Sequence, residues 1–421
     1  MTVRVVNSGY LPSPGLSAAR DTRERATLFD LLALALFLWH ASGVEQFISS
    51  RGGPAPILFQ VASFAILFAV VAGRILAKTQ VAPERSLFGF SVVVAIFATW
   101  NVINFLYGSM SETADALLRN KLVAAMFMVL FAYLLSGERV ARVFSVGCAA
   151  LACLSAFLNL YDLVSSTFST TAGRAAGLYL NPNIAGFMIP CLGLFAMRGL
   201  SPFWRNVVWA IVTVGTIVTF SRAAYLFIIV GTLGLSWLGY LGMRSQRFLF
   251  AAILLPVVAA FIYALSTGLI YDLVAASPLA AHLNENAIQR LGGAGVSILE
   301  NESTTERAGV AAMAFERFLS APLFGHGFAS TYEWDFDQST HNIYLLSMAE
   351  GGVVGLIVYL TLIGYLSLRA RGIAVLVAAI VLLQGLFNHN ILDDLQQALV
   401  VGALAAIGAS ARHDRPRTPL E

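Results

Sequence analysis

One histidine, His341, stands where a long polar stretch of the chain gives way to a strongly apolar run. Asn342 begins that run, so a helix over it would place the imidazole near the helix N-terminus. The positive end of a helix dipole disfavours the protonated ring. A neutral imidazole near pH 7 can accept a proton, as a general base must. His341 is therefore a candidate base, and the alternative is a helix-end histidine that hydrogen-bonds its own loop.

Arginine is the second residue type that points to chemistry, because its planar fork of N–H donors suits phosphate oxygens. Arg222, in Thr219-Phe-Ser-Arg222, lies between two apolar runs with almost no loop between them. An arginine within a membrane costs about 2.5–3.5 kcal/mol or more, so Arg222 is either functional or reaches the lipid headgroups. Arg174 and Arg290 lie in polar stretches, where an arginine is either solvated or part of an anion pocket.

Glu350 is an acidic residue inside an apolar run. It lies nine residues beyond His341, about 13 Å along a helix at 1.5 Å per residue. An acid within the membrane normally has a partner, so we expect one for Glu350. The glycines that follow it, Gly351, Gly352 and Gly355, are expected to let helices pack closely.

Polar side chains also gather in residues 388–394 and in the acidic stretch before His341. Asn388-His389-Asn390 and Asp393-Asp394 stand at the end of a later apolar run, where they either line the same cavity or cap two helices. Asp335 and Asp337, two residues apart, form a pair that can hold Mg²⁺ or Mn²⁺. Such pairs arise by chance in so acidic a stretch, so we predict no metal site and no cofactor.

The composition indicates the kind of fold that positions these residues. Hydrophobic residues make up 58% of the 421 residues and charged residues 12%, against roughly 45–50% and about 25% in soluble domains. This excludes a soluble enzyme, and a net charge of +3 gives no reason to expect a nucleic-acid partner. Apolar runs of membrane-spanning character predict an all-α, polytopic membrane protein with about twelve transmembrane helices. They lie approximately at 26–41, 55–77, 86–107, 121–136, 140–161, 182–198, 203–219, 223–241, 248–267, 342–368, 372–388 and 395–410.

The distribution of basic residues orients these spans. Most lysines and arginines fall in segments on the same side as the N-terminus, which predicts that both termini are cytoplasmic. The predicted organisation is a tail over 1–25, nine spans over 26–267, an outer loop over 268–340, three spans over 341–410 and a tail over 411–421. In the loop, Ser303-Thr-Thr-Glu306 has the spacing of a capping box. Apolar residues then recur at helical spacing, which predicts an amphipathic helix over 304–320 at the membrane surface.

Three stretches together resemble the O-antigen ligase and O-antigen polymerase superfamily of bacterial envelope glycosyltransferases. They are Thr219-Phe-Ser-Arg222-Ala-Ala-Tyr, Ala321-Pro-Leu-Phe-Gly-His-Gly327 and His341-Asn-Ile-Tyr-Leu-Leu-Ser-Met-Ala-Glu350-Gly-Gly-Val-Val-Gly355. The resemblance covers roughly residues 174–395, and the block that begins at His341 is its most specific part. It implies a polytopic helical fold similar to that of the GT-C glycosyltransferases.

Members of that superfamily take a glycan from an undecaprenyl-diphosphate carrier at the periplasmic face, without a nucleotide donor or a metal. The resemblance implies that the donor diphosphate meets Arg222 and an arginine of the long loop. The best match for the loop arginine is Arg290, with Arg307 as its rival. Arg174 is placed in the same donor site.

The resemblance also matches a histidine and an acid. It matches His341 to the family's histidine. It matches Asp393 to an acid near the end of the eleventh span, and Asp394 is not separable from it. Glu350 and Asn342 complete the predicted supporting residues.

We therefore predict an O-antigen ligase of the bacterial inner membrane. It transfers undecaprenyl-diphosphate-linked O-antigen to a sugar hydroxyl of lipid A-core oligosaccharide, with inversion and without a metal. Arginines stabilise the leaving diphosphate, and His341 takes the proton of the attacking hydroxyl. Membrane lipids surround the spans, and no nucleic acid takes part. The alternative within the family is the O-antigen polymerase, and a secondary transporter or lipid flippase is the alternative from another class.

Overall fold

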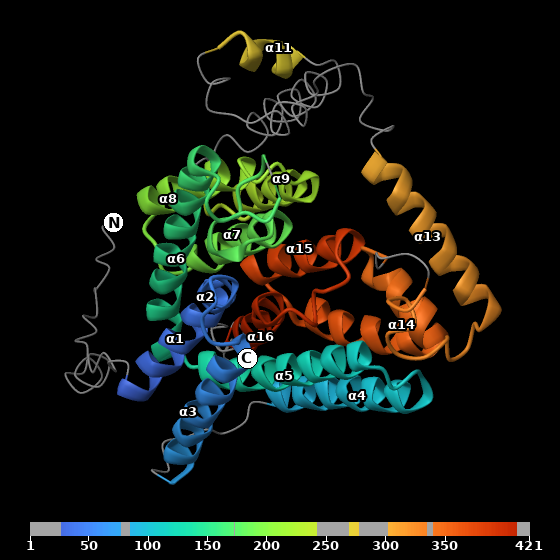
Figure 1. The fold of residues 1–421 in the computed structure, drawn as a ribbon. Coiled ribbons are helices and arrows are strands. Elements are labelled where there is room, and N and C mark those ends of the chain that lie inside the picture. Colours follow the sequence, from blue (N-terminus) through green and yellow to red (C-terminus); the bar gives the residue numbers. More distant parts are fainter. Residues whose placement is uncertain are drawn as a thin grey trace, which may run out of the picture.

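The computed structural model describes residues 27–76, 85–171, 173–241, 269–277, 302–334 and 340–410. Within these ranges every regular element is helical, which confirms the predicted all-α class. The helices, labelled in Figure 1, are α1 (Leu28–Ala41), α2 (Val44–Ser50), α3 (Pro56–Leu76), α4 (Arg85–Tyr107), α5 (Glu112–Leu135), α6 (Glu138–Ser165), the short 3₁₀ helix η1 (Gly177–Tyr179), α7 (Pro182–Ala196), α8 (Pro202–Ile217), α9 (Arg222–Trp237), α11 (Leu269–Ala275), α13 (Glu302–Ser320), α14 (Ile343–Arg369), α15 (Ile373–Phe387) and α16 (Leu395–Ser410).

Eleven of the twelve predicted apolar runs coincide with helices, and the run at 248–267 lies outside the described residues. In the described ranges, α3, α4, α5, α6 and α14 are long and apolar enough to cross a membrane. The pair α1 and α2, bent by 49°, adds a sixth span if the two form one. The protein is thus a multi-pass membrane protein, and the count of twelve spans stays a prediction.

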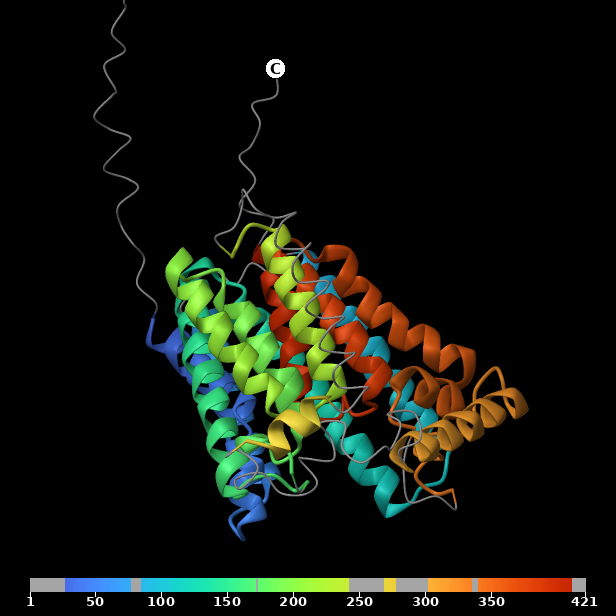
Figure 2. The ribbon, with the colours of Figure 1, turned by 90° about the horizontal axis from the view of Figure 1, so that it is seen from above.

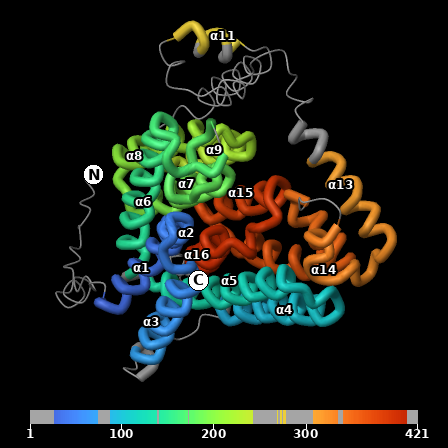
Figure 3. The backbone as a smooth tube through the Cα atoms, in the orientation of Figure 1, coloured from blue at the N-terminus to red at the C-terminus, as the bar shows by residue number. Residues whose placement is uncertain are grey.

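The interior of the bundle is built around α7 and α16. Almost every side chain of α7 is buried, and so are all those of α16 from residue 395 to 409. Helices that are apolar on nearly all sides are expected in such central positions. Figure 3 shows α16 between α1, α5 and α15, so the last helix of the chain packs into the core. Gly402 permits its close approach to α5, because a Cβ there would lie 2.7 Å from the carbonyl oxygen of Met128.

Helix α13 lies outside this bundle and packs against α14 (Figure 2). It spans Glu302–Ser320, where the sequence predicts a helix over 304–320. Val310 and Ala314 are buried, whereas Phe315 and Leu319 are 46% and 59% exposed. The helix therefore has apolar side chains both toward the bundle and away from it. Its place at a membrane surface stays a prediction.

Several connecting segments meet at one end of the bundle, which we call the loop end. Arg174 binds the carbonyl of Thr219, Tyr332 donates to Asn390, and Gly43 lies against both Leu178 and Gln396. These contacts join the turns that follow α1, α6, α8 and α15 to the segment between α13 and α14. As a result, the N-termini of α7, α9, α14 and α16 share the loop end, and the candidate residues of the sequence gather there.

Candidate functional site

His341 lies directly before the start of α14. Asn342 is the N-cap of this helix, and its side-chain oxygen accepts hydrogen bonds from the backbone N–H groups of Tyr344 and Leu345, at 2.9 and 3.2 Å. His341 itself has a positive φ of 49°, a strained conformation for a residue with a side chain. The N-cap and the left-handed backbone conformation together fix the position of His341 at the start of α14.

The imidazole of His341 is half-buried between two other parts of the chain. The ring of His389 lies edge-on to it, with 5.6 Å between the ring centroids. Burial lowers the pKa of His341 from its ordinary value, and the positive charge of Arg307 on α13 lowers it further. The ring is therefore neutral at pH 7 and can accept a proton.

A buried ion pair lies near His389, whose pKa the charge of Lys121 helps to lower. Nζ of Lys121, on α5, is 3.6 Å from Oδ1 of Asp393, and the two side chains are 9% and 6% exposed. The same ammonium lies 4.7 Å from the centroid of the Phe328 ring, a cation–π contact. Burial raises the pKa of Asp393, and the charge of Lys121 opposes that rise. The sequence analysis did not select Lys121, although a lysine that opens an apolar run is a visible signal.

Glu350 is buried within α14, as its place in an apolar run indicates. Its Oε1 accepts a hydrogen bond of 2.7 Å from the hydroxyl of Thr331. Glu350 and Lys121 both line a cavity of about 30 Å³ between α4, α5 and α14, together with Asn104 and Ser347. A cavity of this size and polarity has room for one or two water molecules. The expected partner of Glu350 is thus a hydroxyl, with the Lys121 ammonium at the same cavity.

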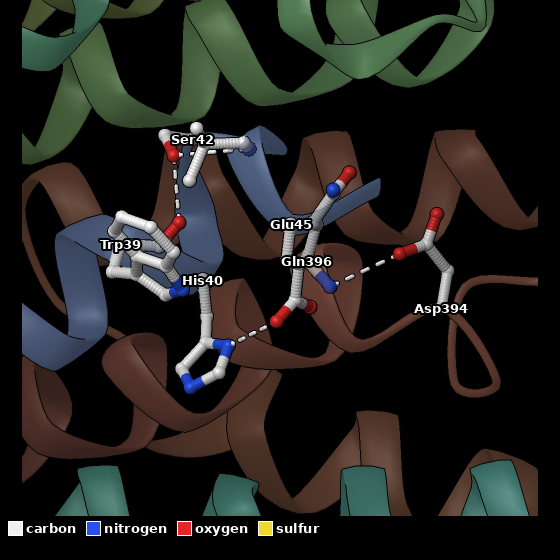
Figure 4. A network of polar contacts seen from close by, with 7 residues as sticks. Trp39, His40, Ser42, Glu45, Asp394 and Gln396 are labelled. Atoms are coloured by element: carbon white, nitrogen blue, oxygen red, sulfur yellow. Dashed lines mark hydrogen bonds and ion pairs between the residues drawn. The ribbon is translucent and has the colours of Figure 1, made fainter. Parts of the chain in front are cut away.

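Asp393 and Asp394, which the sequence could not separate, face different partners. Oδ1 of Asp394 accepts from the backbone N–H of Gln396 at 3.0 Å, and its Oδ2 accepts from the side chain of Gln397 at 3.3 Å. In Figure 4, Asp394 and Gln396 lie close to Glu45. Oε2 of Glu45 is in turn 2.9 Å from Nδ1 of His40. Burial raises the pKa of Asp394 to about 6. Of these two carboxylates, only Asp393 contacts Lys121, whose charge in turn acts on His389.

A second group of polar residues surrounds the first turns of α7 and α9. Nε of Arg174 donates to the carbonyl of Thr219 at 2.9 Å, and its Nη2 donates to Oδ1 of Asn183 at 2.8 Å. The hydroxyl of Ser221 donates to the same amide oxygen at 3.1 Å. Arg222 is exposed and begins α9. Two helix N-termini and two guanidinium groups make this corner suited to an anionic ligand.

Of the two loop arginines, Arg307 and Arg290, the structure describes Arg307. Arg307 is exposed on α13, within electrostatic reach of His341. Arg290 lies outside the described residues, and so do Asp335 and Asp337. In the part of the chain that is described, no three His, Cys, Asp or Glu side chains form a group that could hold a metal ion.

The segment between α13 and α14 inserts into a break in α14. Gly352 has φ of 62° and ψ of −156°, which no helix contains. Around this break, Val353 N–H donates to the carbonyl of Pro322 at 2.8 Å, and Gly327 N–H donates to that of Glu350 at 3.0 Å. A Cβ on Gly352 would lie 2.4 Å from the backbone of Leu323. The glycine expected to serve helix packing therefore admits a loop backbone instead, and this loop is fixed directly beside Glu350.

The fold and this site define a multi-pass helical membrane protein with a neutral, half-buried histidine, His341, which contacts a second histidine near a buried ion pair. Residues 206–360 match the family model described as O-antigen ligase. The match includes Arg222, His341 and Glu350, and it confirms the resemblance to the O-antigen ligase superfamily. It supports a glycosyltransferase-like enzyme.

Other comparisons are distant. No curated protein matches the chain. A solved structure described as "Structural coordination of polymerization and crosslinking by a peptidoglycan synthase complex" contains a similar chain, with 16% identity and a TM-score of 0.44. The alignment covers 78% of this chain and 98% of that one.

Proposed function

We propose that this protein is an O-antigen ligase. It takes O-antigen from undecaprenyl diphosphate and joins it to a sugar hydroxyl of lipid A-core. The observation that carries the proposal is the neutral, half-buried His341 at the start of α14, inside the segment that matches the ligase family. The reaction needs a base at a water-poor site, and His341 meets both conditions.

The proposed reaction is a single displacement at the anomeric carbon. The acceptor hydroxyl oxygen attacks this carbon, and its proton passes to His341. The bond from the anomeric carbon to the diphosphate oxygen breaks, so undecaprenyl diphosphate leaves and the configuration inverts. Negative charge builds up on the departing phosphate oxygens, where preorganised guanidinium donors stabilise it. Arg222, Arg174 and a loop arginine, Arg290 or Arg307, are the proposed donors.

The loop end would then face the periplasm, with both termini in the cytoplasm and the protein in the inner membrane. The N-termini of α7, α9, α14 and α16 share this end, and the corner at Arg174 and Arg222 belongs to it. The polyprenyl tail can remain in the lipid while the diphosphate reaches the arginines. Helix α13 would cover the site at the membrane surface as a lid or a guide for the acceptor.

Deletion of the protein in its own host tests this proposal. Loss of a ligase leaves lipid A-core bare while long glycan persists on the carrier, as lipopolysaccharide gels would show. Loss of an O-antigen polymerase, which uses a second lipid-linked glycan as acceptor, leaves cores that carry a single repeat. In a purified system, a chelator should leave transfer unchanged. Transfer lost in chelator and restored by Mn²⁺ would contradict the metal-free mechanism and favour a site at Asp335 and Asp337.

A further inference from the structure

His389 contacts the ring of His341, and the proposed reaction gives it no part. It lies in the turn between α15 and α16 and is only 8% exposed. The His341 and His389 rings meet at an interplanar angle of 64°, an edge-to-face arrangement. Tyr332 packs on His389 in the same manner, with 5.8 Å between the centroids and an angle of 65°. His389 is thus held between two rings and forms part of the surface that covers His341.

His389 is kept uncharged by burial, helped by neighbouring groups. It faces His341 before α14, Tyr332 in the α13–α14 segment and Lys121 on α5, with Asp393 in its own turn. Burial, then His341, then the Lys121 ammonium lower the pKa of His389 to about 3. Near pH 7 His389 is therefore unprotonated and a weak base, so it is a poor acceptor for a proton from His341. Its role in the pair must come from its ring and its neutrality.

We propose that His389 is a positioning residue for His341: the His389 ring shields the His341 imidazole from water and disfavours its protonated form. The proposal deepens the proposed function, since it rests on His341 as the base for its catalytic meaning. The shielding itself is a property of the folded protein and needs no substrate. The two claims can therefore fail separately.

Two variants separate the ring from its nitrogens. His389→Phe keeps an aromatic ring of similar size, so His341 stays covered. His389→Ala removes the ring and leaves a space beside the polar groups of Lys121 and Asp393, which water can enter. Solvation of His341 then favours its protonated form, and its pKa rises toward the ordinary histidine value of about 6.5.

Diethyl pyrocarbonate modification of the purified, full-length protein measures this directly, because the reagent attacks only the unprotonated ring. The rate of modification at His341 is followed against pH, with the site assigned from fragment ions. We expect the midpoint for His341 to be the same in the wild type and His389→Phe, and higher in His389→Ala. The exposed His326 lies on the same chain and is the internal reference, and its midpoint should not move.

Either of two results would overturn the proposal. In one, His389→Ala leaves the His341 midpoint where it is in the wild type. In the other, His389→Phe shifts it as far as His389→Ala does, which would assign the effect to a ring nitrogen. If the wild type transfers no glycan, the proposed function fails, yet the modification assay still decides whether His389 shields His341. Where transfer is measured, the acid limb of its pH profile should move with the midpoint.

Discussion

Nζ of Lys121 and Oδ1 of Asp393 lie 3.6 Å apart inside the bundle, and each side chain is less than one-tenth exposed. They come from α5 and from the turn before α16, so the pair joins an early helix to the last one. The approach of α5 and α16 is among the most extensive in the fold, and this ion pair stands at its loop end. It therefore fixes the turn that carries His389.

The first prediction follows from the burial of this pair. Lys121→Met leaves the Asp393 carboxylate buried without its cation, and removal of one partner of a buried pair costs about 3–5 kcal/mol. We expect a clear drop in the thermal unfolding midpoint in detergent. The double variant Lys121→Met/Asp393→Leu should recover much of the loss, because no unpaired charge remains. Arg371→Met removes an exposed cation and serves as the control. Equal midpoints for Lys121→Met and this control would contradict the prediction.

The second prediction concerns the proposed base. His341→Ala should abolish glycan transfer and let lipid-linked donor accumulate, and unchanged transfer would rule His341 out. The neutral ring is the active form, and a lowered pKa extends its range toward acid pH. Wild-type transfer should therefore be level through pH 7 and fall only below the ordinary histidine range. In Arg307→Gln one cause of the lowered pKa is gone, so the acid limb should move to higher pH.

The sequence predicted the helices well, because a membrane-spanning helix needs a long apolar run and such runs are local. It also predicted the helix start beside His341, since the change from polar to apolar residues marks it. It did not find Lys121, because the meaning of a lysine depends on what faces it, and Asp393 is more than 270 residues away. For the same reason the sequence left open whether His389 lines the same cavity as His341 or only caps a helix.

The pair Asp393 and Asp394 shows the same limit at closer range. Two adjacent carboxylates share nearly the same sequence neighbours. The turn after α15 therefore decides which one faces Lys121 and which faces Gln396 and Gln397. Gly352 is a further case. The sequence marks Gly352 as a glycine in an apolar run, which predicts close packing of helices. In the structure, it is the loop backbone of residues 322–327 that packs against this glycine.

The third prediction tests the break in α14. Gly352→Ala places a methyl group against the backbone of Leu323 and forces a side chain into a region of φ and ψ that essentially only glycine adopts. Such strain costs about 1–3 kcal/mol before the clash is counted. Gly364→Ala, in the same helix, meets nothing within 4 Å and is the matched control. There alanine should be neutral or stabilising by up to about 1 kcal/mol. The prediction fails if the two variants unfold at the same temperature.

The fourth prediction uses the raised pKa of Asp394, about 6. In the unfolded chain this carboxyl has an ordinary pKa near 3.9, so the folded state holds its proton more tightly. The resulting stability is present below the unfolded pKa and is lost as pH rises through about 6. Asp394→Asn keeps an amide that can bond Gln396 and Gln397 but cannot ionise. The unfolding midpoint of the wild type should fall between pH 5 and 7 by more than that of Asp394→Asn. If the unfolding midpoints of the two proteins change with pH in parallel, Asp394 is ionised across this range. Its hydrogen bonds from Gln396 and Gln397 would then stabilise the carboxylate by more than burial destabilises it.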